Sequence, residues 1–399
     1  KWVFWLMFVG MHVTFLPMHL TGLMGMPRRV YTYLPDRAWE LPNQISTVGA
    51  FIFAAAVLLW ILDMVRNFRP FGPKDAGNVY DGPGLEWLPT GLYSVRSIPV
   101  VTSLYPLWDQ PDLARDVEAG RYFLPNAAIG ERETIITSTV NAEPQALMRM
   151  PRPSPWPIWS AVFTAGFFLL LTVQAYWPSV ISGVLMIYCM IQWCWTLDRP
   201  LPVKTADIGA GIRVPTYIAG PSSHGWWAMI ITLVVAGMVL AMAGFSYVFL
   251  WSRNPGHWVP PPEVSSFALV AIGNLAAIAL AWTAGRLIRR DRPGLAAGAL
   301  ALAAALVAAA WGLDLRSWVD VGLRPEATAQ GATVFAFLAW NGAFAAAGLI
   351  MGLYALARWL GRYLAAERPS TVDLIGLFLA YCAAQGLFAA LLTRLFPGG

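Results

Sequence analysis

The sequence is poor in charged residues, histidine and cysteine, and each shortage argues against a class of function. Only 12% of its 399 residues are charged, about half the share found in soluble domains. Four histidines occur in the whole chain, which limits the metal sites that it can build alone. The three cysteines lie in apolar stretches without paired or metal-ligand spacing, so we expect buried thiols with no redox role. No basic stretch with interleaved aromatic residues occurs, and we expect no nucleic-acid partner.

Hydrophobic residues, by contrast, make up 57% of the chain and include 20 tryptophans. They gather in stretches of about the 20 residues that a helix needs to cross a bilayer. We expect membrane spans at residues 2–23, 43–65, 157–176, 178–197, 226–251, 266–288, 294–313, 333–357 and 372–394. The polar stretch 66–155 lies between the second and third spans. The predicted fold class is therefore all-α, a polytopic membrane helix bundle with about nine transmembrane helices and one long cytoplasmic connector.

The distribution of Lys and Arg sets the expected orientation, because cytoplasmic loops are enriched in both residues. When Lys1 is placed inside and the spans alternate, most of the basic residues fall on the inner side, including the cluster "GRLIRRDRP" at 285–293. Arg28 and Arg29, in "GLMGMPRRVY" at 22–31, then lie on the outer side, against this bias. One explanation is that both side chains extend to lipid headgroups. The alternative, which we favour, is that the pair binds a fixed anion, since guanidinium groups match carboxylates in shape and charge.

A resemblance to a known family supports the second explanation. The segment "WLMFVGMHVTFLPMHLTGLMGMPRRVYTYLPD" at 5–36, followed by "NQISTVGAFIF" at 43–53, resembles the last two core helices of subunit I of haem–copper cytochrome c oxidase. The resemblance implies that Arg28 and Arg29 bind the propionates of the two haems. It also implies that the haem and copper ligands lie on earlier helices. We therefore expect no catalytic residue and no metal ligand in this chain, and structural roles for His12 and His19.

The remainder of the chain resembles other parts of the same enzyme. The segment "GLEWLPTGLYSVRSIPVVTSLYPLW" at 84–108 is similar to the inner-side tail of subunit I, with Thr90, Gly91 and Leu92 in place of its proline run. Residues 225–264 are similar to a helix of subunit III and its proline-rich exit, with Ala236 in place of the family's glutamate. The expected domains are the last two core helices (1–65), a cytoplasmic tail and connector (66–155), a two-helix extension (156–198) and a degenerate five-helix subunit III-like domain (212–399).

The resemblance as a whole implies the C-terminal part of a fused subunit I/III, in a multi-pass protein of the bacterial inner membrane. The complete enzyme would reduce O2 to water with electrons from cytochrome c and translocate protons. Its expected partners are the N-terminal part of subunit I, subunit II, cytochrome c and membrane lipids. The chain opens at Lys1 inside an apolar segment, so we expect a preceding part and no catalysis by this part alone. The alternatives are a quinol-oxidising member of the superfamily and a non-enzymatic membrane scaffold or assembly subunit.

Overall fold

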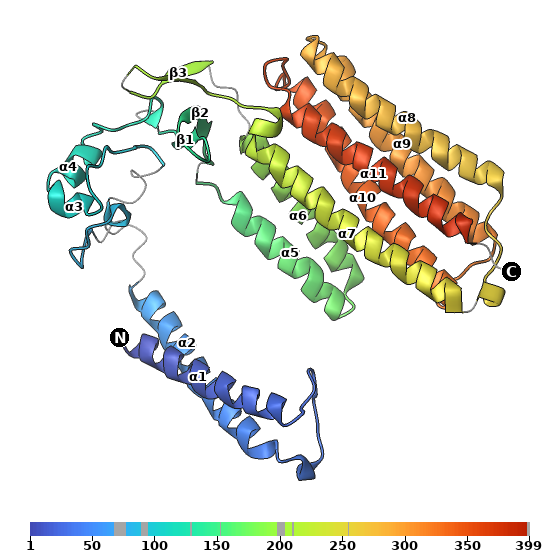
Figure 1. Ribbon diagram of the computed structural model, residues 1–399, viewed down its shortest axis with the longest axis horizontal. Helices are drawn as coiled ribbons and strands as arrows, with labels where there is room; N and C mark the ends of the chain where they lie inside the picture. Colours follow the sequence, from blue (N-terminus) through green and yellow to red (C-terminus); the bar gives the residue numbers. More distant parts are fainter. Residues whose placement is uncertain are drawn as a thin grey trace. The chain divides into compact units, whose positions relative to one another are not determined.

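The computed structural model describes residues 1–67, 77–88, 95–127, 130–151, 153–197, 204–209, 211–253 and 255–396. These residues form mostly helices, together with two small antiparallel two-stranded sheets (Figure 1). The chain divides into two compact units, Lys1–Tyr80 and Asp81–Gly399. The position 90–92, where the sequence departs from the tail's proline run, lies outside the described residues.

The first unit is a hairpin of two long helices, α1 (Trp2–Leu23) and α2 (Glu40–Asn67). The two helices pack closely because small residues lie at their interface. A Cβ atom on Gly10 would come 2.7 Å from the backbone nitrogen of Phe53, and one on Gly49 would collide with the backbone of Val13 and Thr14. Most of the remaining side chains are exposed, including those of several large aromatic residues near the start of α1. The hairpin therefore presents a wide apolar surface.

The polar connector folds into a small extramembrane unit. It contains α3 (Pro106–Asp109), α4 (Leu113–Glu118), β1 (Glu133–Thr137) and β2 (Pro144–Arg149). Strands β3 (Thr205–Asp207) and β4 (Arg213–Pro215), which follow the sixth helix, share a hydrophobic cluster with this segment. The cluster joins Leu124 and Leu147 to Ala206 and Val214. Residues that precede α5 (Trp156–Thr172) and residues that follow α6 (Tyr176–Leu197) in the sequence thus build one hydrophobic core.

Helices α5 and α6 form a helical hairpin. The hydroxyl groups of Ser179 and Ser182 each donate a hydrogen bond of 2.9 Å to a backbone carbonyl of α5. The expected span 157–176 was too long at its C-terminal end. Helix α5 ends at Thr172 because Gln174 adopts a left-handed conformation, with φ of 60°, and the chain reverses there.

The last five helices form a bundle: α7 (His224–Arg253), α8 (Val264–Arg289), α9 (Pro293–Asp320), α10 (Ala329–Leu360) and α11 (Ser370–Leu395). Helix α11 contacts each of the other four. The core of this five-helix bundle is rich in alanine and leucine, and small residues permit close approach of the helices. For example, a Cβ atom on Gly352 would lie 2.9 Å from that of Ala304.

Eight of the described helices are long and apolar enough to cross a membrane, and α5 is a shorter apolar helix. The predicted all-α polytopic membrane bundle is confirmed. The expectation of three buried thiols was wrong at one position: Cys189 and Cys382 are buried, whereas Cys194 is exposed because it lies on an outward-facing side of α6.

Candidate functional site

The turn that carries Arg28 and Arg29 is built by the end of α1. Gly25 has a φ of +86°, a conformation that glycine adopts without steric cost. The Gly25 amide donates to the Gly22 carbonyl and the Met26 amide donates to the Thr21 carbonyl, both at 3.0 Å. This pair of bonds is the Schellman motif, which satisfies the last carbonyl groups of a helix. Pro27 follows and cannot continue the helix. The sequence Gly-Met-Pro therefore fixes the point at which the two arginines leave the helix.

Three side chains hold this turn in place: Tyr33 and Trp39 of the loop between α1 and α2, and Asn43 of the first turn of α2. The indole nitrogen of Trp39 donates to the Met24 carbonyl at 3.2 Å, which ties the far end of the loop to the end of α1. The Trp39 ring packs edge-on against Tyr33, with the ring centroids 5.7 Å apart. The Asn43 amide donates to the Tyr33 hydroxyl at 3.1 Å. Sequence reasoning did not single out Trp39, Tyr33 or Asn43, since none belongs to a spacing pattern.

Both arginine side chains are exposed. Within the described part of the chain, neither guanidinium group makes a hydrogen bond or an ion pair. Arg29 also has a φ of 62°, which costs about 1–2 kcal/mol for a residue with a Cβ atom. Strained backbone of this kind is concentrated at functional sites. The structure therefore places two adjacent fixed positive charges on a turn held from both sides, and no described side chain acts as their counterion.

The two histidines of α1 lie earlier in the helix and do not join this turn. Both are exposed, and each places its Nδ1 atom near a backbone carbonyl one turn earlier: His12 at 2.8 Å from Phe8 and His19 at 2.9 Å from Phe15. Among the described residues, no group of three or more His, Cys, Asp or Glu side chains could hold a metal ion. The described part of the chain thus offers the arginine turn as its candidate site for a charged ligand.

The fold and this turn define the class of protein: a multi-pass helical membrane protein with two adjacent, exposed arginines on the turn between its first two spans. Residues 1–52, which contain the whole turn, match the family described as cytochrome c and quinol oxidase polypeptide I. These residues are a subunit I region of the haem–copper oxidase family, and the chain is a multi-pass protein of the bacterial inner membrane.

Two relatives illustrate the similarity. Cytochrome c oxidase subunit 1 of Bacillus sp. (strain PS3) is 35% identical over 194 residues, which are 47% of this chain and 28% of the relative. Probable quinol oxidase subunit 1 of Staphylococcus aureus (strain USA300) is 30% identical over 213 residues, 52% of this chain and 29% of the relative. The chain thus spans less than a third of the length of each of these relatives.

Proposed function

We propose that this chain is part of a respiratory terminal oxidase, in which Arg28 and Arg29 bind the propionate groups of haem. The observation that carries the proposal is the turn after α1, with its two exposed guanidinium groups that lack partners among the described residues. A propionate is a carboxylate, and a guanidinium group donates two parallel hydrogen bonds to it. The donor chemistry therefore fits the group. The bound haem supplies the iron that carries electrons.

The arginines have three roles in this proposal. They donate hydrogen bonds to the propionates, which fixes the orientation of the haem. They neutralise acids that would be costly to bury next to hydrocarbon. Their positive charge also favours the reduced haem, because reduction adds an electron, and so raises its midpoint potential. Trp39 and Tyr33 act as positioning residues, since they hold the turn rather than the ligand.

The apolar faces of α1 and α2 suit the proposed place of this hairpin in a larger subunit I. Trp2, Phe4 and Trp5 are all more than half exposed. We propose that the N-terminal part of subunit I, with the haem and copper ligands, covers one side of the hairpin and that lipids cover the other. Subunit II and cytochrome c are the further proposed partners.

We also propose roles for the remaining segments. Residues 66–155 form the cytoplasmic tail and connector, 156–198 a two-helix extension, and 212–399 a subunit III-like domain that supports subunit I. Ala236, in place of the family's glutamate, is buried within the bundle. Its methyl group cannot exchange a proton, so this position contributes nothing to proton uptake.

The proposed reaction is the reduction of O2 to water with electrons from cytochrome c, coupled to proton translocation. A quinol-oxidising enzyme is the second candidate, because one of the two relatives is named as a probable quinol oxidase subunit. Oxygen consumption by the purified complete complex decides between them. Turnover with reduced cytochrome c supports the first, and turnover with quinol alone supports the second. A purified complex without haem would instead favour a non-enzymatic scaffold.

A further inference from the structure

Helix α8, at the edge of the five-helix bundle (Figure 1), has one exposed face that changes from apolar to basic along its length. On the side opposite its buried residues Asn274, Ala281 and Ile288, exposed side chains recur every three or four positions. They form the α8 stripe, which consists of five residues of α8 and its C-cap residue: Ile272, Leu275, Ala279, Trp282, Arg286 and Arg290. At 3.6 residues per turn, these positions lie within about 80° of the helix circumference. The α8 stripe is therefore a single surface, apolar up to Trp282 and positively charged beyond it.

The place of this change matches the thickness of a bilayer. From Val264, the first residue of α8, to Trp282 the helix rises about 27 Å at 1.5 Å per residue. The hydrocarbon core of a bilayer is about 30 Å thick. Trp282 is 66% exposed, and tryptophan is enriched at the membrane–water interface. Arg286 lies about 6 Å beyond Trp282 along the helix axis, so the arginines of the α8 stripe reach the level of the lipid phosphate groups.

The guanidinium groups at the end of the α8 stripe have N–H donors available for an anion. The Arg286 guanidinium lies over the Trp282 ring, 5.8 Å from its centroid. This cation–π contact uses none of its N–H donors. Arg290 and Arg292, which follow in the turn between α8 and α9, are also exposed. None of these three guanidinium groups makes a hydrogen bond or an ion pair with a described residue.

The acidic residues of this turn and of the adjoining start of α11 leave an excess of positive charge. Residues 286–292 include four arginines and one aspartate, Asp291. Asp291 is exposed and forms no ion pair with a described arginine. Asp373 of α11 accepts from Arg289 at 2.7 Å, so each of these two carboxylates is matched by at most one arginine. Two positive charges therefore remain at the end of the α8 stripe.

We propose that the α8 stripe binds an anionic phospholipid, with the phosphate group between Arg286 and Arg290 and the acyl chains along Leu275 and Ile272. Guanidinium groups bind phosphate through paired hydrogen bonds. A zwitterionic lipid has the same phosphate, but its headgroup also carries a positive charge that the arginines repel. A free phosphate ion has no acyl chains and gains nothing from the apolar part of the stripe. This lipid site is independent of the proposed oxidase reaction.

The test measures lipid binding to the purified, delipidated complete complex in a neutral detergent by native mass spectrometry. The probes are phosphatidylglycerol, which is anionic, and phosphatidylcholine, which is zwitterionic. The variant combines Arg286→Gln with Arg290→Gln. Each basic residue near an anionic membrane surface contributes about fivefold in affinity, so this variant should bind phosphatidylglycerol at least about tenfold more weakly. Its affinity for phosphatidylcholine should stay unchanged.

The matched control combines Arg316→Gln with Arg324→Gln. Both arginines are exposed and lie at the opposite end of the bundle, at the end of α9 and in the segment that follows it. The control loses the same charge and should bind phosphatidylglycerol as the unmodified complex does. Inorganic phosphate should displace phosphatidylglycerol no better than chloride at the same ionic strength.

Four results would overturn the proposal. Unchanged phosphatidylglycerol binding by the Arg286 and Arg290 variant would remove the site, and an equal loss in the control would assign binding to net charge alone. Specific displacement by inorganic phosphate would identify a free anion as the ligand. Loss of a partner subunit with unchanged lipid binding would make the α8 stripe a protein interface. Should the variant fail to assemble, a photoactivatable phosphatidylglycerol is cross-linked to the unmodified complex: label within residues 272–292 supports the site, and label confined to other segments contradicts it.

Discussion

Gly49 of α2 lies so close to Thr14 of α1 that a Cβ atom at position 49 would come 2.7 Å from the Thr14 hydroxyl oxygen. This contact sets the spacing of the two helices that flank the arginine turn. We expect Gly49→Val to force the helices apart and to destabilise the complete protein by about 1–3 kcal/mol, as overpacked interfaces do. Thermal unfolding and haem content after purification measure the effect. Gly22→Ala is the control, since a Cβ atom there meets nothing within 4 Å. Equal stability of the two variants would contradict the packing described for the hairpin.

Gly25 provides a second test of the turn, because its φ of +86° is unfavourable for any residue with a side chain. Gly25→Ala should destabilise the end of α1 by about 1–2 kcal/mol and shift Arg28 and Arg29 away from the haem propionates that we propose as their ligands. The expected readout is a lower melting temperature together with reduced haem occupancy. A variant with normal haem occupancy and normal stability would show that the Schellman motif does not position the arginines.

The ion pair of Asp314 and Arg394 joins α9 to α11 inside the bundle, with both side chains less than a tenth exposed. Arg394→Met should destabilise the protein by about 3–5 kcal/mol, because it leaves a buried carboxylate without its partner. The double variant Asp314→Leu with Arg394→Met should recover a large part of that loss, since it removes the remaining charge as well. Chemical or thermal unfolding of both variants measures the difference. A double variant as unstable as the single one would mean that the pair contributes mainly through packing.

Tyr217, in the segment before α7, gives a prediction for alkaline pH. Burial raises the pKa of its phenol, and its hydroxyl accepts a hydrogen bond from the Ser370 amide at 3.1 Å. A raised pKa in the folded state means that Tyr217 contributes stability below its ordinary pKa of about 10, which is lost as the pH rises through the folded-state value. Tyr217→Phe should cost about 1 kcal/mol at neutral pH and flatten the loss of stability above pH 10. Melting temperatures from neutral to alkaline pH test this. If the melting temperature of Tyr217→Phe falls above pH 10 as steeply as that of the unmodified protein, other groups cause the loss of stability.

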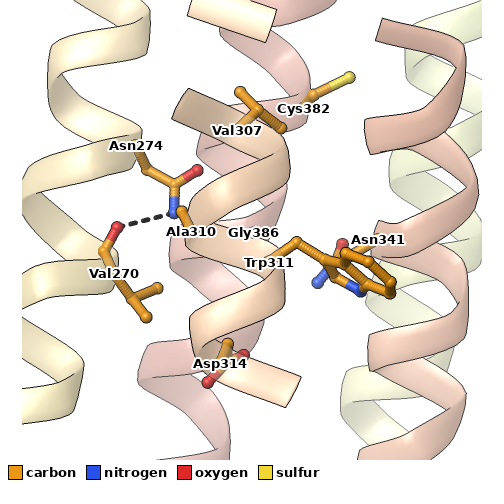
Figure 2. Close-up of a pocket in the computed structure, with 9 residues that line it drawn as sticks. All are labelled: Val270, Asn274, Val307, Ala310, Trp311, Asp314, Asn341, Cys382 and Gly386. Carbon is orange, nitrogen blue, oxygen red and sulfur yellow. Dashed lines mark hydrogen bonds between the residues drawn. The ribbon is translucent and has the colours of Figure 1, made fainter. Parts of the chain in front are cut away.

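The sequence predicts the long helices well, because an apolar stretch of about 20 residues has few alternatives to a spanning helix. It fails where a single residue decides the geometry: α5 ends at Thr172, and Gln174, two residues later, reverses the chain with its left-handed backbone. The arginine pair is visible in the sequence through its adjacency and its position after an apolar run. Its support by Trp39 and Tyr33 is not visible, since that depends on contacts across a loop. A small pocket in the C-terminal bundle, lined by residues of α8, α9, α10 and α11, cannot be seen in the sequence for the same reason (Figure 2).

The most direct test of the proposed function is the midpoint potential of haem in the complete, purified complex, with and without Arg28→Gln and Arg29→Gln. Arg37→Gln, an exposed arginine in the same loop, is the matched control. Loss of both charges should lower the potential by on the order of 200 mV, because one Coulomb interaction near 8 Å at an effective dielectric constant of about 20 is worth about 2 kcal/mol, or about 90 mV for one electron. The control should leave the potential unchanged. A potential that does not respond to the double substitution would contradict propionate binding and would leave the two arginines as contacts for lipid headgroups.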